Sequence, residues 1–256
     1  MTGIRGTEME VKTDGRIINF IKRKIENSKN IVAVLGIEML VESGGYDLDT
    51  NDENYRVEEE YGFCPEDMLS TSFFNAKVEK FYRFYKKEIL GMQMYSTPAY
   101  NALMRLQAQG KLSAVINQNF HGLPQEVKLK KVINLNGNIH INQCPHCDKD
   151  FDMQYIKNAK GIPQCDRCKV AIRPGIRLLG ERVESVLMTQ AAVACEAADV
   201  LLILGKNMYN DKLEYSAAPE HEQLKVLFSK SEFEQNNKVN FIIRDDICKF
   251  LPLIIN

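Results

Sequence analysis

The chain has 256 residues, of which 45% are hydrophobic, and its formal net charge is −1. This length and composition suit one large α/β domain or two smaller lobes, and the scattered Lys and Arg provide no basic field, so we expect no nucleic-acid partner. The longest apolar run, residues 200–204, is too short to span a bilayer, and the N-terminus lacks the apolar core of a signal sequence. We therefore expect no membrane association and a cytoplasmic location.

Apolar periodicity predicts strands that alternate with helices along the chain. The run IVAVLG, which ends at Gly36, is typical of a buried parallel strand because it is short, apolar throughout and closed by a glycine. In chain order, the pattern predicts helices over residues 15–28, 66–90, 98–110, 185–198 and 245–253, and strands over residues 31–36, 113–117, 132–135, 199–205 and 238–243. Asp245 is the expected cap of the last helix. The acidic run over residues 46–61 is expected to be a solvated loop or helix face.

This alternation indicates an α/β fold, a Rossmann-like parallel sheet with helices on both faces. Strands that end at Gly36, Asn117 and Gly205 would bring these residues together at the carboxyl edge of the sheet, where such folds bind ligands. The turn after Gly36 lacks the second close glycine of a phosphate cradle. By itself it therefore does not predict a nucleotide site.

Two CxxC pairs, Cys144 with Cys147 and Cys165 with Cys168, are separated by seventeen residues. Each pair can present two thiolates from a tight turn, and this spacing favours a zinc ribbon over disulfides or unrelated cysteines. Four thiolates fill a tetrahedral shell and leave no position for water, so the predicted zinc is structural. His146 lies inside the first pair, and we expect it to be an exposed loop residue and not a ligand.

The segment NQNFHGLPQ, residues 117–125, resembles the TQNxDGLHQ motif of the sirtuins, the NAD-dependent protein lysine deacylases. NLNG, residues 134–137, falls on the family's ELHG, and the cysteine quartet follows at the family's spacing. IRPGIRLLGE, residues 172–181, resembles LRPxVVxFGE, and ADVLLILGKN, residues 198–207, resembles the strand that ends in GTS. The match runs from about residue 31 to the C-terminus.

The resemblance implies a Rossmann-like lobe, a small zinc lobe, and a cleft between them for NAD and an acyl-lysine peptide. We expect a single unit over residues 1–256. The Rossmann-like lobe would comprise approximately residues 15–45, 110–140 and 173–256, and the small lobe a helical part, 46–109, and a zinc ribbon, 141–172.

The resemblance also assigns ligand contacts to particular residues of this chain. Cofactor contacts fall on Gly36, Gln118, Asn119, Gly205 and Asn207, and the border of a peptide groove falls on Leu179, Gly180 and Glu181. An extended peptide would add to this border as a strand.

Several positions that carry chemistry in the family are altered here. The family's GAGIS falls on residues 36–40, where only the first glycine remains, and Glu38 would place a carboxylate where backbone amides approach a diphosphate. The alternative is that Glu38 turns to solvent. The family's PDFR falls on residues 46–49, so its aromatic residue and arginine are replaced, and Asp49 reverses a charge. GTS becomes GKN, in which Asn207 could donate in place of the lost hydroxyl.

The catalytic histidine of the family falls on Asn136, an amide that can hold a hydroxyl but cannot act as a general base. The aspartate of TQNxD falls on His121, which is either a loop histidine or a displaced substitute for the base. These clustered changes favour a sirtuin-like pseudoenzyme that acts by binding NAD or ADP-ribose, an acyl-lysine or other extended peptide, or a protein partner. Two alternatives stay open: an active NAD-dependent deacylase or ADP-ribosyltransferase with a rearranged site, and a structural subunit with no small ligand. The sequence leaves the oligomeric state open.

Overall fold

A computed structural model of the chain describes residues 9–11, 15–48, 50–206, 222–230 and 239–255. Within these residues, seven strands form one sheet in the order β1-β9-β8-β7-β2-β3-β4, and every neighbouring pair is parallel. The strands are β1 (Met9–Val11), β2 (Ile31–Leu35), β3 (Leu112–Asn117), β4 (Val132–Asn134), β7 (Val200–Leu204), β8 (Leu224–Phe228) and β9 (Phe241–Ile243).

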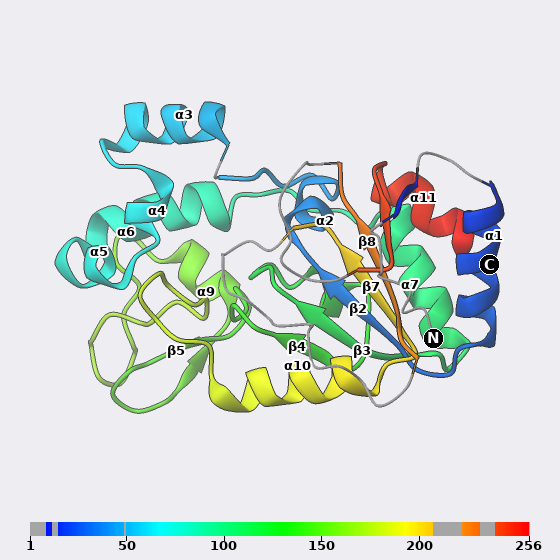
Figure 1. The fold of residues 1–256 in the computed structure, drawn as a ribbon. Helices are drawn as coiled ribbons and strands as arrows, with labels where there is room; N and C mark the ends of the chain where they lie inside the picture. Colours follow the sequence, from blue (N-terminus) through cyan, green and yellow to red (C-terminus); the bar gives the residue numbers. More distant parts are fainter. Residues whose placement is uncertain (1–8, 12–14, 49, 207–221, 231–238, 256) are drawn as a thin grey trace.

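Helices cover both faces of this sheet (Figure 1). The helices α1 (Gly15–Asn27), α7 (Pro98–Ala108) and α11 (Ile247–Ile254) pack on one face, and α10 (Ser185–Ala197) packs on the other. Along β2, Ala33 and Leu35 join the core on the α7 side, whereas Val32 and Val34 join the core on the α10 side. A strand buried on both faces is apolar at every position, which explains the run IVAVL. The predicted α/β fold with helices on both faces is confirmed.

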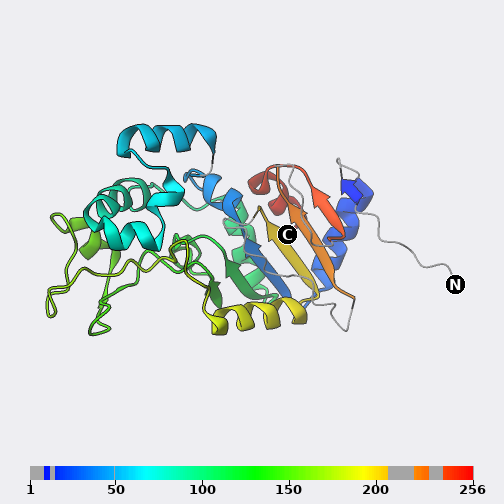
Figure 2. The ribbon, with the colours of Figure 1, turned by 60° about the vertical axis from the view of Figure 1, so that its left-hand side comes forward.

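The remaining elements form a small lobe beside the sheet (Figure 2). They are α3 (Asn51–Tyr61), α4 (Pro65–Met68), α5 (Thr71–Ala76), α6 (Val78–Phe84), the π-helical turn η1 (Tyr85–Ile89), α9 (Met153–Asn158), and the antiparallel pair β5 (Asn142–Gln143) and β6 (Asp150–Phe151). Phe81, Tyr82, Phe84 and Tyr85 are at most 1% exposed and belong to its core. The boundaries predicted for the two lobes stay predictions.

Two short helices, α2 (Ile37–Val41) and α8 (Leu123–Glu126), directly follow Gly36 and Gly122 at the carboxyl edge of the sheet. None of the helices in the described part of the chain is both long and apolar enough to cross a membrane.

Three local predictions differ from the structure. The cap of α11 is Asp246 and not Asp245, because the Asp246 side chain accepts a hydrogen bond from the Lys249 N–H, while the Asp245 carboxylate accepts from the Asp246 N–H. The single helix predicted over residues 66–90 is divided into α4, α5, α6 and η1, and Lys77, with ψ of 48°, forms the break between α5 and α6. Strands β1 and β8 were not predicted; β8 carries Lys225 inside an otherwise apolar run.

Candidate functional site

The four paired cysteines meet in the small lobe. Their sulfur atoms all lie within 4.8 Å of one another, and the sulfurs of Cys147 and Cys165 are 3.8 Å apart. Four thiolates at about 2.3 Å from a central zinc would be separated by roughly 3.8 Å. The set of Cys144, Cys147, Cys165 and Cys168 therefore fits Zn²⁺ in a closed tetrahedral shell.

Both cysteine pairs adopt the same turn. The residues after the second cysteines, Asp148 and Lys169, have φ angles of 55° and 58° in the left-handed region. Their N–H groups donate to the carbonyl oxygens of Cys144 and Cys165, each at 3.0 Å. The two turns thus bring their cysteine sulfur atoms to one centre.

Backbone N–H groups also point at the sulfur atoms. The His146 N–H lies 3.4 Å from the sulfur of Cys144, and the Cys168 N–H lies 3.4 Å from the sulfur of Cys165. Such donors favour the thiolate form that a metal requires. The His146 side chain is exposed, as expected for a loop residue.

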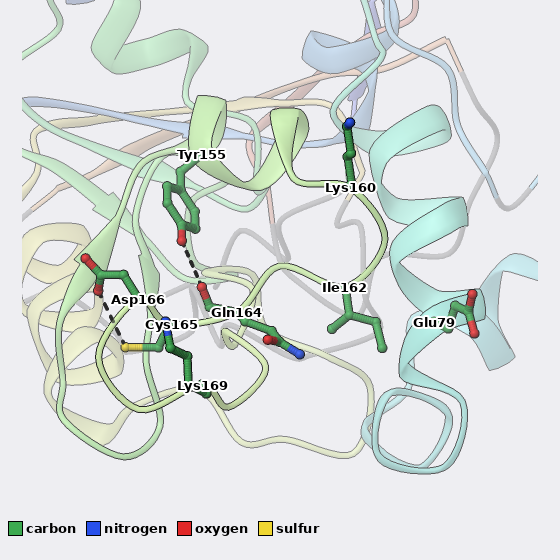
Figure 3. Close-up of a pocket in the computed structure, with 8 residues that line it drawn as sticks. All are labelled: Glu79, Tyr155, Lys160, Ile162, Gln164, Cys165, Asp166 and Lys169. Carbon is green, nitrogen blue, oxygen red and sulfur yellow. Dashed lines mark hydrogen bonds between the residues drawn. The ribbon is translucent and has the colours of Figure 1, made fainter.

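A broad surface pocket of about 590 Å³ lies beside the second cysteine turn (Figure 3). The Tyr155 hydroxyl, from α9, donates to the carbonyl oxygen of Gln164 at 2.9 Å. Lys160 and Glu79 lie away from this contact, on the other side of the picture. The polar groups of the pocket do not converge on one point, so we interpret the Tyr155 contact as a brace between α9 and the zinc loops.

A second concentration of polar residues lies at the carboxyl edge of the sheet. Gly36 follows β2 and Gly205 follows β7, and the Gly36 N–H donates to the Leu204 carbonyl at 2.8 Å. A Cβ at Gly36 would lie 2.2 Å from the carbonyl oxygen of Lys206. Gly36 is therefore required by the close approach of two strand ends, whatever else binds there.

Glu38, in the first turn of α2, fills the space over the end of β7. One carboxylate oxygen accepts from the Lys206 N–H at 2.6 Å, and the other accepts from the Ser229 hydroxyl at 2.7 Å. A Cβ at Gly205 would lie 2.3 Å from the Glu38 carboxylate, so only glycine permits this contact. The alternative that Glu38 turns to solvent is wrong. The Lys206 ammonium in turn lies 3.2 Å from the Asp47 carboxylate.

The segment that follows α2 is tied to the small lobe by a buried carboxylate. Glu88 is 3% exposed and accepts from the hydroxyls of Tyr46 and Tyr61 at 2.8 and 2.9 Å and from the Arg56 guanidinium at 2.7 Å. Burial opposes ionisation of Glu88, but these hydrogen bonds outweigh it and hold the pKa of the carboxyl below its usual value. The network fixes Tyr46, the first residue of the segment aligned with PDFR, against η1.

Gln118 and Asn119 lie just after β3, as predicted, and both are at most 5% exposed. The Gln118 N–H donates to the Leu35 carbonyl at 3.1 Å, and the Asn119 amide nitrogen donates to the Gly36 carbonyl at 2.8 Å. The strand ends predicted to gather at this edge are therefore linked by hydrogen bonds.

Asn136 is held at the same edge and is 4% exposed. Its amide nitrogen donates to the Gln118 carbonyl, and its amide oxygen accepts from the Arg177 Nε at 2.9 Å. The Arg177 guanidinium also donates to the Glu181 carbonyl at 2.9 Å. Sequence reasoning missed Arg177, although an arginine at the second valine position of the aligned LRPxVVxFGE was a visible signal.

The residues predicted to border a peptide groove form hydrogen bonds with other residues of this protein. The Leu179 N–H and C=O pair with residues 69–71 at 2.9 and 3.0 Å. The Leu178 N–H donates to the Glu181 carboxylate at 2.8 Å, and the Glu181 N–H donates to the Leu178 carbonyl at 3.1 Å. Gly180, exposed and with φ of 93°, forms the tip of this turn.

The His121 ring is buried and directed at the small lobe. Its Nε2 lies 3.3 Å from the Ile89 carbonyl oxygen, and burial lowers the pKa of the imidazole to about 4. His121 is therefore neutral near pH 7. Asn207 and Asp49 lie outside the described residues.

Comparison with known proteins gives consistent matches. The Sir2 family model matches residues 49–209. The NAD-dependent protein deacetylase of Clostridium acetobutylicum is 31% identical over 243 residues, which cover 93% of this chain and 98% of that protein. The NAD-dependent protein deacetylase of Clostridium tetani is 33% identical over 240 residues, which cover 92% of this chain and 96% of that protein.

Solved structures show the same fold. The structure of Sir2Tm bound to a propionylated peptide has a TM-score of 0.78 and 25% identity, and the match covers 93% of this chain and 96% of that chain. A Sir2 homolog in complex with NAD has a TM-score of 0.81 and 20% identity, and the match covers 98% of this chain and 95% of that chain.

Proposed function

The chain belongs to the Sir2 family, and from this premise we propose that it is a zinc-stabilised, sirtuin-fold binding protein that does not turn over NAD or acyl-lysine substrates. Its structural metal is zinc, held by the four cysteines. Its cleft presents hydrogen-bond acceptors to a donor group of a peptide or protein partner.

The position of Glu38 is the observation that carries the proposal. A diphosphate is bound by N–H and hydroxyl donors, but the Lys206 N–H and the Ser229 hydroxyl already donate to the Glu38 carboxylate. A carboxylate at this point also repels a dinucleotide of the same sign. The described residues therefore do not fit NAD in this arrangement.

The surroundings of Asn136 support the same conclusion. An amide cannot take a proton near neutral pH, and both polar atoms of this amide are engaged, with Gln118 and with the Arg177 guanidinium. Absence of a general base typically lowers a rate by about 10² to 10⁴.

Two features support binding over a purely structural role. Gln118 and Asn119 remain polar although both are buried at a strand end. In the part of the chain that the structure describes, the amide oxygen of Asn119 has no hydrogen-bond partner, which leaves an acceptor for a ligand's donor. A peptide that adds as a strand would have to displace the internal partners of Leu178 or Leu179.

The similarity to the NAD-dependent protein deacetylases of the two Clostridium species favours the alternative, an active NAD-dependent deacylase or ADP-ribosyltransferase with a rearranged site. This alternative requires Glu38 to leave the end of β7 and a base other than Asn136. His121, the other candidate, bonds to Ile89 and has a pKa of about 4, so it is a weak base.

Nicotinamide release tests the proposal. The protein is incubated with NAD and an acetylated peptide, and we expect no release above the uncatalysed background. The matched variant is Glu38→Ala, which removes the carboxylate but keeps Asn136, and we expect it also to lack turnover. Release by the native protein at ordinary enzyme rates, about 1 s⁻¹ or more, would refute the proposal.

A further inference from the structure

The helix α10 has an apolar face on the side that points away from the sheet. Its inner side packs on the sheet through the buried Ala191 and Cys195, and both Figure 1 and Figure 2 show the helix along the lower side of the molecule. On the outer side, Val186 is 64% exposed and Val193 is 59% exposed. Residues seven apart are separated by about two helical turns, so these two side chains lie on one face of the helix.

The outer face of α10 is also nearly free of charge. The helix α1 has the same length of 13 residues and also has an exposed side, but it contains five charged residues where α10 contains one, Glu196. A surface helix of a soluble protein usually presents charged and polar residues opposite its core face. Exposed aliphatic side chains with few charges around them are instead typical of the centre of a protein interface. We therefore interpret the outer face of α10 as a contact surface.

Apolar groups continue past the N-terminal end of α10. A groove of about 300 Å³ lies beside the first turn of the helix, and its lining includes Ile141, Val183 and Leu187. Ile141 is 60% exposed, which is unusual for a large aliphatic side chain. The charged Arg182 and Glu184 line the same groove, so the apolar surface has a charged border at this end.

The charges at the two ends of this surface make it complementary to itself. Arg182 precedes the helix and Glu196 is in its last turn; both are exposed, and neither has an ion-pair partner in the described part of the chain. In an antiparallel pair of α10 helices related by a twofold axis, Val186 of one copy faces Val193 of the other, and Arg182 lies beside Glu196 at both ends. Each Glu196 carboxylate then also approaches the positive end of the other helix, where no side chain caps the first turn.

We propose that α10 joins two copies of this chain in an antiparallel dimer with twofold symmetry. Gln190 is exposed and lies near the midpoint between the two valines, so its amide reaches the twofold axis and pairs with the same amide of the second copy. A helix of 13 residues is about 20 Å long, and with Ile141 it offers less than the roughly 800 Å² per partner of a standard interface. The dimer is therefore weak, with a dissociation constant of about 10 to 100 µM.

Analytical ultracentrifugation of the zinc-loaded native protein tests the proposal. The average mass in solution is measured at protein concentrations from about 5 to about 500 µM. We expect a reversible rise from 29.3 kDa, the mass of one chain, toward twice that value. A protein that stays at the mass of one chain over this range contradicts the proposal. So does a mass that rises beyond that of a dimer, because a twofold contact closes on itself.

Two matched substitutions locate the contact. Val193→Lys places a charge at the centre of the apolar face and is expected to weaken the association at least about tenfold. Leu253→Lys makes the same change at a 56% exposed residue of α11, on the other face of the sheet, and should change the dissociation constant less than about twofold. Equal effects of the two substitutions on the association would contradict a contact through α10.

Exchange of the end charges tests the antiparallel arrangement. Arg182→Glu and Glu196→Arg, each alone, bring like charges together across the dimer and should weaken it by about threefold or more at low ionic strength. The double variant restores opposite charges in exchanged order and should return the dissociation constant to near the native value. A double variant that associates no better than the single variants rules out this arrangement. The concentration series uses only the native protein, so it decides whether a dimer forms even if a variant fails to fold.

Discussion

The zinc loops and the carboxyl edge of the sheet both gather hydrogen-bond donors around one point. In the zinc loops this point is available to a metal, whereas at the sheet edge a side chain of the protein occupies it. In the zinc loops, N–H groups support the sulfurs of Cys144 and Cys165, and all four sulfurs converge on one point. At the sheet edge, comparable donors on Lys206 and Ser229 are directed at Glu38, a side chain of the same chain. Donor groups that converge on one point bind a ligand only if no side chain of the protein already occupies them. Resemblance to a family does not show whether they are occupied.

Loss of the zinc is expected to have the largest effect. Structural zinc contributes about 10 to 16 kcal/mol of apparent binding free energy in small modules, and Cys144 and Cys165 also belong to the small-lobe core. Cys165→Ser or chelation should therefore abolish cooperative unfolding of this lobe, as measured by circular dichroism and hydrogen exchange. Metal analysis should give about one equivalent for the native protein.

The matched control is His146→Ala, which removes an exposed side chain of the same loop and should leave the zinc content unchanged. A native protein that is free of metal and equally stable would contradict the zinc assignment.

Glu88→Gln tests whether the segment after α2 is fixed by its own network. The substitution keeps the shape but removes the charge that three donors share, and it leaves Arg56 without its buried partner. We expect a loss of about 3 kcal/mol in the free energy of unfolding, measured by urea denaturation. Glu60→Gln, which removes an exposed ion pair with Lys87, should cost less than about 1 kcal/mol. Equal effects of the two substitutions would show that the network does not anchor the segment.

The buried imidazole of His121 predicts a pH dependence of stability. Its pKa is lowered by burial to about 4, against an ordinary value of about 6.5, so between these values the unfolded chain binds the proton and the folded chain does not. Stability should therefore be fully present above about pH 6.5 and fall as the pH decreases toward 4, by up to about 3 kcal/mol.

Denaturant titrations at a series of pH values measure how the free energy of unfolding changes with pH. His121→Gln should flatten the dependence of stability on pH, whereas Met94→Leu, which alters a half-buried apolar side chain and removes no titratable group, should not. An unchanged slope in His121→Gln would assign the acid sensitivity to other groups.

Asn136→His is expected to have the smallest effect. The substitution introduces an imidazole that can act as a base. However, Glu38 still accepts from the Lys206 N–H at the end of β7, and Arg177 remains beside position 136. Deacylation of an acetylated peptide should stay at background when product is followed by mass spectrometry. Substantial activity in this single variant would show that the loss of the base is the only defect.

The zinc quartet and the strand ends could be predicted from the sequence because each rests on a local pattern: CxxC spacing for the metal, and apolar runs closed by glycine for the sheet edge. The direction of Glu38 could not, because its partners Lys206 and Ser229 lie 168 and 191 residues away along the chain. The pairing of Asn136 with Arg177 joins residues 41 positions apart along the chain, so no local pattern predicts it. Likewise, the position of the His121 ring depends on a carbonyl of η1.

Calorimetric titration with NAD tests most directly whether the cleft is filled by the chain's own carboxylate. The account predicts no specific binding by the native protein or by Asp47→Asn, which loses the Lys206 contact but keeps Glu38 in place. It predicts measurable binding by Glu38→Ala, in which the Lys206 N–H and the Ser229 hydroxyl become available to a phosphate. Micromolar binding of NAD by the native protein, unchanged in Glu38→Ala, would contradict it.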